Sequence, residues 1–439
     1  MINLRKYQNK KIAIYGMGLT GCSAARILKK LGARVFCWDD NVQVRKKIEN
    51  YNFPINKFWL NKNLVDNIVI SPGIDVSRCK IKNYLKKNLN KIITDLDIFF
   101  ELNKKAIIIS ITGTNGKSTT CKLIEKILKT SKYKVKTVGN IGKPVLSESY
   151  GKNKIFILEV SSYQLQYSKT FRSNHAAIIN ISPDHLERHK SMKNYVRTKS
   201  KIFTGQKKSN FSYINSDNKY SNFIKEIHKQ KKLKSKLVIV KKTDYKNLIG
   251  SINNSYFNSE GNIENLNFAY RIAKNLKIKN ETIINAVNRF KSLPHRQEVF
   301  FSSKSLVCVN DSKATSFEAS LQSLKNFNKI YWIVGGLPKE KNSFYLKNVK
   351  KKIVKAYIVG KKPLFFKNQI KNFVPYNISK TINNAINDIY KDINFNKKQK
   401  VTILLSPAAA SYDQFSNFVK RGNYFKNLIS KKIKKKQYV

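Results

Sequence analysis

Cysteines and long apolar runs are scarce in this sequence. Its 439 residues include only five cysteines, which are scattered and form no Cys-x-x-Cys pair. This pattern argues against a disulfide framework and a zinc cluster, and it favours a reduced, cytoplasmic compartment. No apolar run is long enough to cross a bilayer, and the first ten residues lack the apolar core of a signal peptide. A soluble protein without membrane attachment is therefore expected.

Acidic residues are also few. The chain has 26 Asp plus Glu against 86 Lys plus Arg, a formal net charge of +60. Such a charge attracts nucleic acid and anionic membranes. The lysines are nevertheless spread over the whole chain with many asparagines and isoleucines, and no arginine-rich, aromatic-interleaved stripe stands out. We attribute the charge to compositional bias and expect no specific nucleic-acid partner. Nucleic-acid binding stays open as the alternative, to be tested by salt-sensitive binding to DNA.

The most informative stretch is an apolar run followed by a glycine-containing turn. Residues 106–112 are rich in isoleucine, residues 113–119 read Gly-Thr-Asn-Gly-Lys-Ser-Thr, and helical periodicity follows. The free N–H groups of a helix N-terminus and the charge of Lys117 would bind phosphates, and the hydroxyl of Ser118 or of the next threonine would bind Mg²⁺. Ile111 stands where a full P-loop has its first glycine. The pattern predicts a phosphate loop for ATP.

Further along, an acid and two histidines are candidate ligands. Glu159 lies in the apolar strand-like run 154–160. A buried carboxylate costs several kcal/mol unless it is paired or bound to a metal, so Glu159 is a candidate Mg²⁺ ligand. His185 and His189 are four residues apart and would share one face of a helix. No other cysteine or histidine is near them, so a zinc site is not expected.

The N-terminal region carries a second glycine motif. Gly16-x-Gly-x-x-Gly21 follows the strand-like residues 11–15, and a second predicted strand at 34–38 ends in Asp39. This is the dinucleotide fingerprint with its ribose-binding acid. A third predicted strand ends in Ser71-Pro-Gly73, a backbone turn where open α/β sheets bind ligands. A small nucleotide-binding domain is expected, and these residues do not decide which nucleotide it holds.

The last third repeats a strand–helix rhythm. Strands are predicted at 305–309, 329–334, 355–359 and 401–405, each ending in small or polar residues. Loops at the carboxyl ends of such strands form a common binding edge. A third α/β domain with a ligand site is expected after the linker at 293–298.

Taken together, these motifs resemble the Mur ligase family over nearly the whole chain. Residues 113–119 are similar to the family's short ATP loop, and Leu158–Ser162 and Asn180–His185 are similar to its central motifs. Asn310–Thr315 and Ser406–Phe415 resemble the branch that adds D-glutamate. The resemblance implies an α/β fold of three domains: a Rossmann-like nucleotide-sugar domain at 1–93, a P-loop-type ATPase domain at 94–296 and a Rossmann-like amino-acid domain at 297–439.

The resemblance also implies an activity. It is the ATP-dependent, Mg²⁺-dependent addition of D-glutamate to UDP-N-acetylmuramoyl-L-alanine through an acyl phosphate, in peptidoglycan precursor synthesis, by a cytoplasmic monomer. A different amino-acid specificity within the same family is the remaining enzymatic alternative.

The resemblance further implies site residues by position. ATP would be bound by Gly113, Thr114, Asn115, Gly116, Lys117, Ser118, Thr119, Asn267, Arg296 and Asp311. The UDP-sugar would be bound by Leu19, Thr20, Asp39, Ser71, Gly73, Asn140 and Ser161. D-glutamate would be bound by Lys313, Thr315, Lys339, Ser411 and Phe418. The catalytic residues would be Lys117, Glu159, His185 and Lys199, and the metal ligands Ser118, Glu159, His185 and a carbamylated Lys199. Two segments depart from the family pattern: Ile263-Glu264 replaces His-Asn, and the Gly-Gly-Leu-Pro-Lys segment ending at Lys339 replaces Gly-Gly-Asp-Gly-Lys.

Overall fold

The structure is a computed structural model that describes residues 4–60, 65–140, 142–147, 154–338, 344–393 and 400–435. The chain divides into two compact units, 1–254 with 262–290, and 255–261 with 291–439. Two β-sheets lie in the first unit and one in the second, so the α/β fold class is confirmed. Each sheet falls within one of the predicted domain ranges, whose boundaries remain predictions. Within the described residues, no helix combines the length and apolar character needed to span a bilayer.

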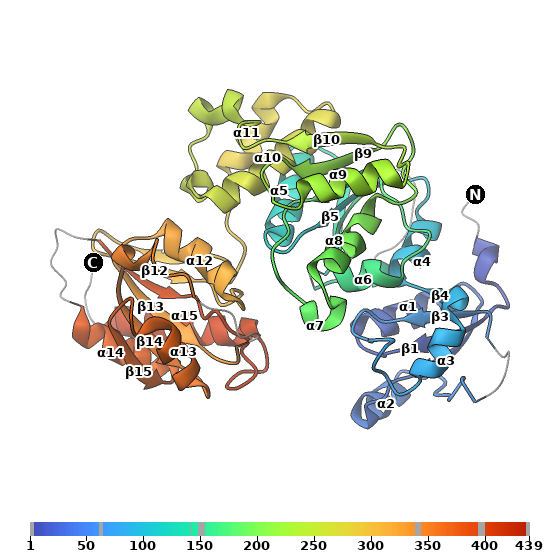
Figure 1. The fold of residues 1–439 in the computed structure, drawn as a ribbon, viewed down its shortest axis with the longest axis horizontal. Coiled ribbons are helices and arrows are strands. Elements are labelled where there is room, and N and C mark those ends of the chain that lie inside the picture. Colours follow the sequence, from blue (N-terminus) through green and yellow to red (C-terminus); the bar gives the residue numbers. More distant parts are fainter. Residues whose placement is uncertain are drawn as a thin grey trace. The chain divides into compact units, whose positions relative to one another are not determined.

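The N-terminal sheet has parallel strands in the order β2-β1-β3-β4 (Figure 1). Its elements are β1 (Lys11–Tyr15), α1 (Leu19–Lys30), β2 (Arg34–Trp38), α2 (Val42–Glu49), β3 (Asn67–Ile70), α3 (Lys82–Lys87) and β4 (Ile92–Ile93). Ile12 and Ile14 belong to one apolar cluster, and Ala13 and Tyr15 belong to another. The central strand β1 is therefore buried on both faces, which is why its sequence is continuously apolar rather than alternating.

The central sheet has six strands in the order β10-β9-β8-β5-β7-β6, and all are parallel. Its strands are β5 (Ile107–Thr112), β6 (Val135–Gly139), β7 (Ile155–Glu159), β8 (His175–Ile178), β9 (Phe211–Asn215) and β10 (Lys236–Val240). The helices are α4 (Asp95–Leu102), α5 (Lys117–Thr130), α6 (Ser162–Tyr167), α7 (Leu186–His189), α8 (Met192–Ser200), α9 (Ser221–Gln230), α10 (Glu260–Asn275) and α11 (Asn280–Asn288).

Strand β9, like β6, was not predicted from the sequence. It contains Ser212, which is fully buried. Its hydroxyl donates to Gln206 Oε1 at 2.6 Å and lies 2.7 Å from the hydroxyl of Ser235. Because these partners satisfy the buried hydroxyl, a polar residue is tolerated inside the sheet. Its polar sequence concealed the strand.

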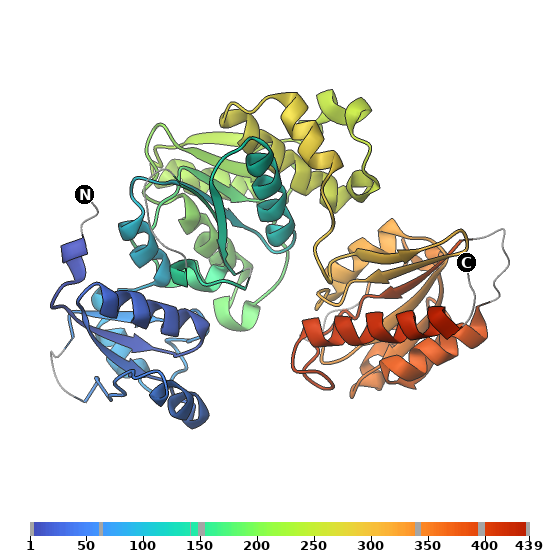
Figure 2. The same cartoon turned by 180° about the vertical axis from the view of Figure 1, so that it is seen from behind.

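The C-terminal sheet has the order β11-β12-β16-β13-β14-β15, and only its edge pair β11–β12 is antiparallel among the described strands. Its elements are β11 (Glu298–Ser302), β12 (Leu306–Asn310), α12 (Phe317–Asn326), β13 (Ile330–Gly335), β14 (Ile353–Val359), α13 (Pro363–Ile370), β15 (Tyr376–Lys380), α14 (Ile382–Asp392), β16 (Val401–Leu405) and α15 (Phe418–Lys435). Strands β11 and β15 were not predicted. Helices α12 and α13 cover one face, and α14 and α15 the other, where α15 runs along the sheet (Figure 2).

Strand order places the binding loops. In the N-terminal sheet, β2 and β3 lie on opposite sides of β1. In the central sheet, β7 and β8 lie on opposite sides of β5. In open α/β sheets a crevice forms at the carboxyl ends of strands where the winding reverses. The loop after β1 therefore meets the loop after β3, and the loop after β5 meets the loop after β8. These loops carry the predicted nucleotide motifs.

Candidate active site

The loop between β5 and α5 has the backbone of a phosphate loop. Gly116 precedes α5 with a left-handed φ of 79°. A β-carbon there would lie 2.2 Å from the side-chain oxygen of Asn265, so the position favours glycine both for its conformation and for its space. The ammonium of Lys117 donates to the carbonyl oxygens of Gly113 at 2.9 Å and Thr114 at 2.7 Å. The lysine thus folds over the loop, beside the helix N-terminus that attracts anions.

Glu159, at the end of β7, contacts the start of α5 and the residue that follows β6. Its carboxylate is 2% exposed and accepts hydrogen bonds from the hydroxyl of Ser118 at 2.5 Å and the side-chain amide of Asn140 at 3.1 Å. Hydroxyl and carboxylate oxygens suit Mg²⁺, which usually keeps waters and substrate phosphates in its coordination shell. The chemistry of these adjacent donors therefore fits the predicted metal. No group of three or more His, Cys, Asp or Glu side chains within metal-binding reach occurs among the described residues.

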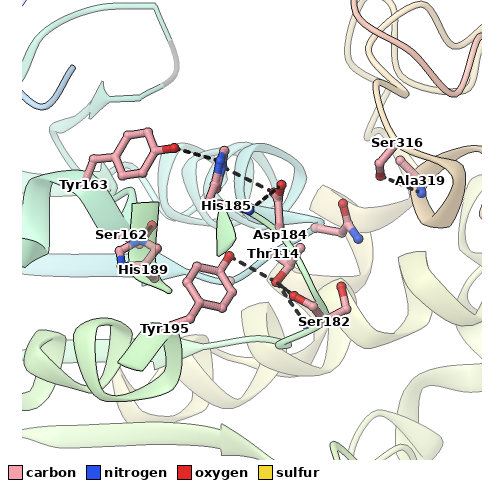
Figure 3. A network of polar contacts seen from close by, with 12 residues as sticks. Thr114, Ser162, Tyr163, Ser182, Asp184, His185, His189, Tyr195, Ser316 and Ala319 are labelled. Atoms are coloured by element: carbon pink, nitrogen blue, oxygen red, sulfur yellow. Dashed lines mark hydrogen bonds and ion pairs between the residues drawn. The ribbon is translucent and has the colours of Figure 1, made fainter. Parts of the chain in front are cut away.

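The two histidines of the central motif have separate partners (Figure 3). His185 precedes α7 in a left-handed conformation, with Nδ1 2.9 Å from the Tyr163 hydroxyl and Nε2 3.3 Å from a carboxylate oxygen of Asp184. His189 is buried, and its Nε2 lies 2.9 Å from the hydroxyl of Ser162. Burial lowers the pKa of His189 to about 4. The two side chains thus hydrogen-bond to different groups, although both rings pack against the Tyr163 ring, with ring centroids 4.8 and 5.8 Å apart.

Lys199 reaches the phosphate loop from α8. The side chain is 2% exposed, and its ammonium donates to the carbonyl oxygen of Gly113 at 2.9 Å and the hydroxyl of Thr112 at 3.3 Å. It also lies 4.7 Å from the centre of the Tyr195 ring. Burial, with a smaller contribution from the charge of Lys117, holds the pKa of Lys199 well below its usual range. Two lysines therefore converge on the single carbonyl of Gly113.

A cavity of about 300 Å³ lies between the N-terminal loops and the central sheet of the first unit. Its lining includes all seven residues predicted to bind the UDP-sugar: Leu19, Thr20, Asp39, Ser71, Gly73, Asn140 and Ser161. The turn after β1 is held by two contacts. Asp39 accepts a hydrogen bond from the N–H of Met17 at 2.7 Å, and the Ser71 hydroxyl donates to the carbonyl of Gly16 at 2.5 Å.

Sequence reasoning missed Gln164, which also lines this cavity. Its side-chain oxygen accepts hydrogen bonds from the N–H and the hydroxyl of Ser161, both at 3.1 Å. Its amide nitrogen donates to Asp95 at 3.0 Å, whereas the other oxygen of Asp95 has no hydrogen-bond partner among the residues that the structure describes. Ser161-x-x-Gln164 is a capping box at the start of α6, and that spacing is the signal in the sequence.

Asp95 gives a test of how this buried network titrates. Burial raises its pKa from 3.8 to about 6, and the residue is 1% exposed. Because the folded protein holds this proton more tightly than the unfolded chain, Asp95 contributes stability below pH 4 that is lost as pH rises through 6. Asp95→Asn cannot titrate. In urea unfolding, its free energy of unfolding relative to wild type is expected to rise by about 3 kcal/mol between pH 4 and pH 8.

The control for this prediction is Asp66→Asn. The backbone N–H of Lys11 is the main cause that lowers the pKa of Asp66, so this carboxyl titrates below pH 4 and the stability of the variant relative to wild type should stay nearly constant between pH 4 and pH 8. Parallel stability curves for wild type and Asp95→Asn from pH 4 to pH 8 would contradict the buried titration.

In the second unit, three loops at strand carboxyl ends are hydrogen-bonded together. Leu337 and Ala410 exchange backbone hydrogen bonds, which join the loops after β13 and β16. The buried guanidinium of Arg421 donates to the carbonyl oxygens of Ser312 and Ala409 at 2.8 and 2.9 Å. These two hydrogen bonds connect the loop after β12 to the loop after β16. The ammonium of Lys313 lies 4.0 Å from the centre of the Phe418 ring.

Two more of the predicted D-glutamate residues lie in the same loops. Ser411 is buried within the loop after β16, Thr315 lies in the loop before α12, and Lys339 lies outside the described residues. The predicted nucleotide residue Asp311 accepts hydrogen bonds from the hydroxyls of Ser323 and Ser406 at 2.6 and 2.8 Å. Burial raises the pKa of Asp311 to about 6. Arg296, also predicted to bind nucleotide, belongs to this unit.

Of the asparagines on α10, Asn265 rather than Asn267 reaches the phosphate loop. The side-chain oxygen of Asn265 accepts from the hydroxyl of Thr120 at 3.0 Å. The side chain of Asn267 instead contacts the segment 242–245. It accepts a hydrogen bond from the N–H of Tyr245 at 3.0 Å and donates one to the carbonyl of Lys242 at 3.1 Å. The predicted contact of Asn267 with the nucleotide stays a prediction.

Comparison with known proteins gives consistent results. The family model "Mur ligase middle domain" matches residues 111–290, and "Mur ligase MurD-like, N-terminal domain" matches residues 10–93. A protein of Rickettsia felis named UDP-N-acetylmuramoylalanine--D-glutamate ligase is 35% identical over 97% of this chain and 98% of its own length. The protein of the same name from Wolbachia pipientis is 31% identical, with 97% of each chain covered.

Solved structures share the fold at much lower identity. MurF ligase from Thermotoga maritima, solved in complex with ADP, aligns with a TM-score of 0.57 at 13% identity and covers 98% of each chain. MurF from Acinetobacter baumannii aligns with a TM-score of 0.59 at 14% identity, covering 98% of this chain and 93% of its own. With relatives above 30% identity over nearly its whole length and two matching family models, this chain belongs to the Mur ligase family.

Proposed function

We propose that this protein joins D-glutamate to UDP-N-acetylmuramoyl-L-alanine, converting ATP to ADP and phosphate, in peptidoglycan precursor synthesis. The observation that carries the proposal is the phosphate loop on which Lys117 and Lys199 converge, next to the Ser118–Glu159 contact. The names of the relatives support the choice of substrates. We place the enzyme in the cytoplasm, where ATP is available, as a monomer.

The reaction joins two anions, so its main requirement is charge neutralisation. The alanyl carboxylate attacks the γ-phosphorus of ATP, which releases ADP and forms an acyl phosphate. The amine of D-glutamate then attacks the acyl carbon, its proton is lost, and phosphate leaves. Lys117 and the N-terminus of α5 bind the phosphates where negative charge develops. Asn140 and Ser161, at the edge of the cavity, orient the muramoyl part.

The residues that would hold Mg²⁺ are Ser118, Glu159, His185 and Lys199 as its carbamate. When bound, the metal supplies positive charge to the phosphoryl group. Carbamylation would turn the buried cation of Lys199 into an anion, and burial favours the neutral amine from which a carbamate forms.

Phosphate release tests the proposed function directly. Purified protein is incubated with ATP, Mg²⁺ and UDP-N-acetylmuramoyl-L-alanine, with and without D-glutamate, and the product is identified by mass spectrometry. D-glutamate should stimulate release and add its mass less water to the nucleotide. If L-alanine or a diamino acid serves as well, the protein has another specificity within the family and the proposed substrate is wrong.

The amino-acid pocket can be tested separately by substitution. D-glutamate carries two carboxylates, and a pocket that loses one donor leaves a buried charge without a partner. Lys313→Ala and Ser411→Ala are therefore each expected to raise the KM for D-glutamate by about tenfold or more, equivalent to one charged hydrogen bond. The KM values for ATP and the UDP-sugar should change less than that.

Lys350→Ala is the matched control, because Lys350 is an exposed lysine of the same unit. It should leave all three KM values as they are in wild type. An unchanged KM for D-glutamate in both pocket variants would show that Lys313 and Ser411 are not part of the pocket.

A further inference from the structure

The sequence departs from the family pattern at Ile263-Glu264, and Glu264 places a carboxylate next to Asn180, which contacts the phosphate loop. Glu264, on α10, accepts a hydrogen bond from the side-chain amide of Asn180 at 2.7 Å. Its other oxygen accepts one from the side-chain amide of Asn215, at the end of β9. Burial raises the pKa of Glu264, and these two amides oppose that effect. The carboxylate thus faces two N–H donors, one from β9 and one from the segment after β8.

Asn180 connects this carboxylate to the loop. Its side-chain oxygen accepts hydrogen bonds from the backbone N–H groups of Thr114 at 3.2 Å and Asn115 at 2.9 Å. A primary amide presents an acceptor at one end and donors at the other. With an obligate acceptor at its nitrogen end, the amide must turn its oxygen toward the loop. Glu264 and the two backbone N–H groups of the loop therefore favour the same orientation of the Asn180 amide.

Only a carboxylate satisfies both amides at once. The nitrogen of Asn215 also donates to the carbonyl of Ile179 at 3.3 Å, which keeps its donor end toward Glu264. Glutamine at 264 has one acceptor and one donor end, so one of the two asparagines would meet an N–H group. That asparagine then either loses a buried hydrogen bond or turns over. If Asn180 turns over, its nitrogen faces the N–H groups of Thr114 and Asn115.

We propose that Glu264 is a positioning residue for the ATP loop, which holds the Asn180 amide in the orientation that supports Thr114 and Asn115. The inference rests on the proposed function only in taking this loop as the ATP site. Glu264 does not touch the phosphates. It acts by keeping the loop in the conformation that binds them.

The first test is Glu264→Gln. The KM for ATP is expected to rise about tenfold, as for loss of one hydrogen bond to a charged group. The KM values for D-glutamate and the UDP-sugar should stay within about twofold of wild type, a split that general loss of structure would not produce. Thermal unfolding is measured on the same samples. Glu226→Gln is the control, since Glu226 is an exposed acid on α9.

The second test exchanges the amide at position 180 and the carboxylate at position 264. Asn180→Asp alone places two carboxylates against each other and should weaken ATP binding. In the double variant Asn180→Asp with Glu264→Gln, the new glutamine amide donates to the new carboxylate at position 180, and its oxygen accepts from Asn215. The second oxygen of that carboxylate accepts from the loop. The double variant should bind ATP more tightly than Asn180→Asp, measured by titration with ATP. This comparison holds even if Glu264→Gln alone fails to fold.

The outcomes separate the two proposals. If wild type releases phosphate but Glu264→Gln has a wild-type KM for ATP, the positioning role is wrong and the proposed function stands. An equal rise in all three KM values, or a double variant no better than Asn180→Asp, also overturns the positioning role. If wild type does not use ATP at all, both proposals fall.

Discussion

Lys117→Ala is expected to lower kcat/KM for ligation by ~1,000-fold or more, which corresponds to about 4 kcal/mol of lost transition-state stabilisation. The ammonium already lies over the loop, 2.9 and 2.7 Å from the carbonyl oxygens of Gly113 and Thr114. ATP phosphates entering at the helix N-terminus would meet this charge. If the transferred phosphoryl group gains charge on its outer oxygens, the lysine would stabilise the transition state more than the ground state.

Steady-state kinetics and thermal unfolding together test this prediction. Lys122→Ala is the matched control, since Lys122 lies on the same helix and is paired with Glu125. It should retain wild-type activity. A Lys117→Ala enzyme within about tenfold of wild type, a loss of only ~1.4 kcal/mol, would show that Lys117 does not neutralise the phosphates.

Lys199→Ala is expected to be as damaging, and activity of the wild type should depend on carbon dioxide. The ammonium is buried beside the Gly113 carbonyl, where Lys117 already supplies a positive charge. A second cation adds little there, whereas a carbamate would be an anion able to hold Mg²⁺ near Glu159. Activity should therefore fall in CO₂-depleted buffer and return with bicarbonate.

The substitution Lys199→Arg separates charge from carbamylation. Arginine keeps the positive charge but does not form a carbamate, so it should be as inactive as alanine. Lys193→Ala is the control, because Lys193 is exposed on the same helix. In ¹³C-bicarbonate, wild type should show a carbamate carbon signal that Lys199→Ala lacks. An active enzyme without that signal and indifferent to bicarbonate would disprove the carbamate.

The residues that line the cavity of the first unit could be predicted from the sequence because they follow strand ends. Leu19, Asp39 and Ser71 lie shortly after β1, β2 and β3, and parallel strands bring their carboxyl ends to one edge. The central motifs behave in the same way, since Glu159 ends β7 and Asn180 follows β8. Residues that directly follow neighbouring parallel strands therefore lie close together in the fold, even when they are far apart in the sequence.

Residues that support the site through helices were not predictable in this way. Gln164 and Asp95 are 69 positions apart, and their hydrogen bond depends on how α4 packs beside α6. Asn265 and Asn267 differ by two positions on α10, which turns one toward the phosphate loop and the other toward residues 242–245. Packing decides which face of a helix turns toward the site, and the residue types alone do not identify that face.

The sequence by itself determined the α/β fold class and the family, and it located the glycine-containing loop after β5 and the residues that line the cavity of the first unit. Each of these is encoded locally, by an apolar strand and the few residues that follow it. Only the tertiary structure decided that Lys117 and Lys199 share the carbonyl of Gly113, and that Glu264 stands behind Asn180. Those contacts join elements that lie far apart in the chain, so they exist only when the strands and helices have packed and buried polar groups have found their partners.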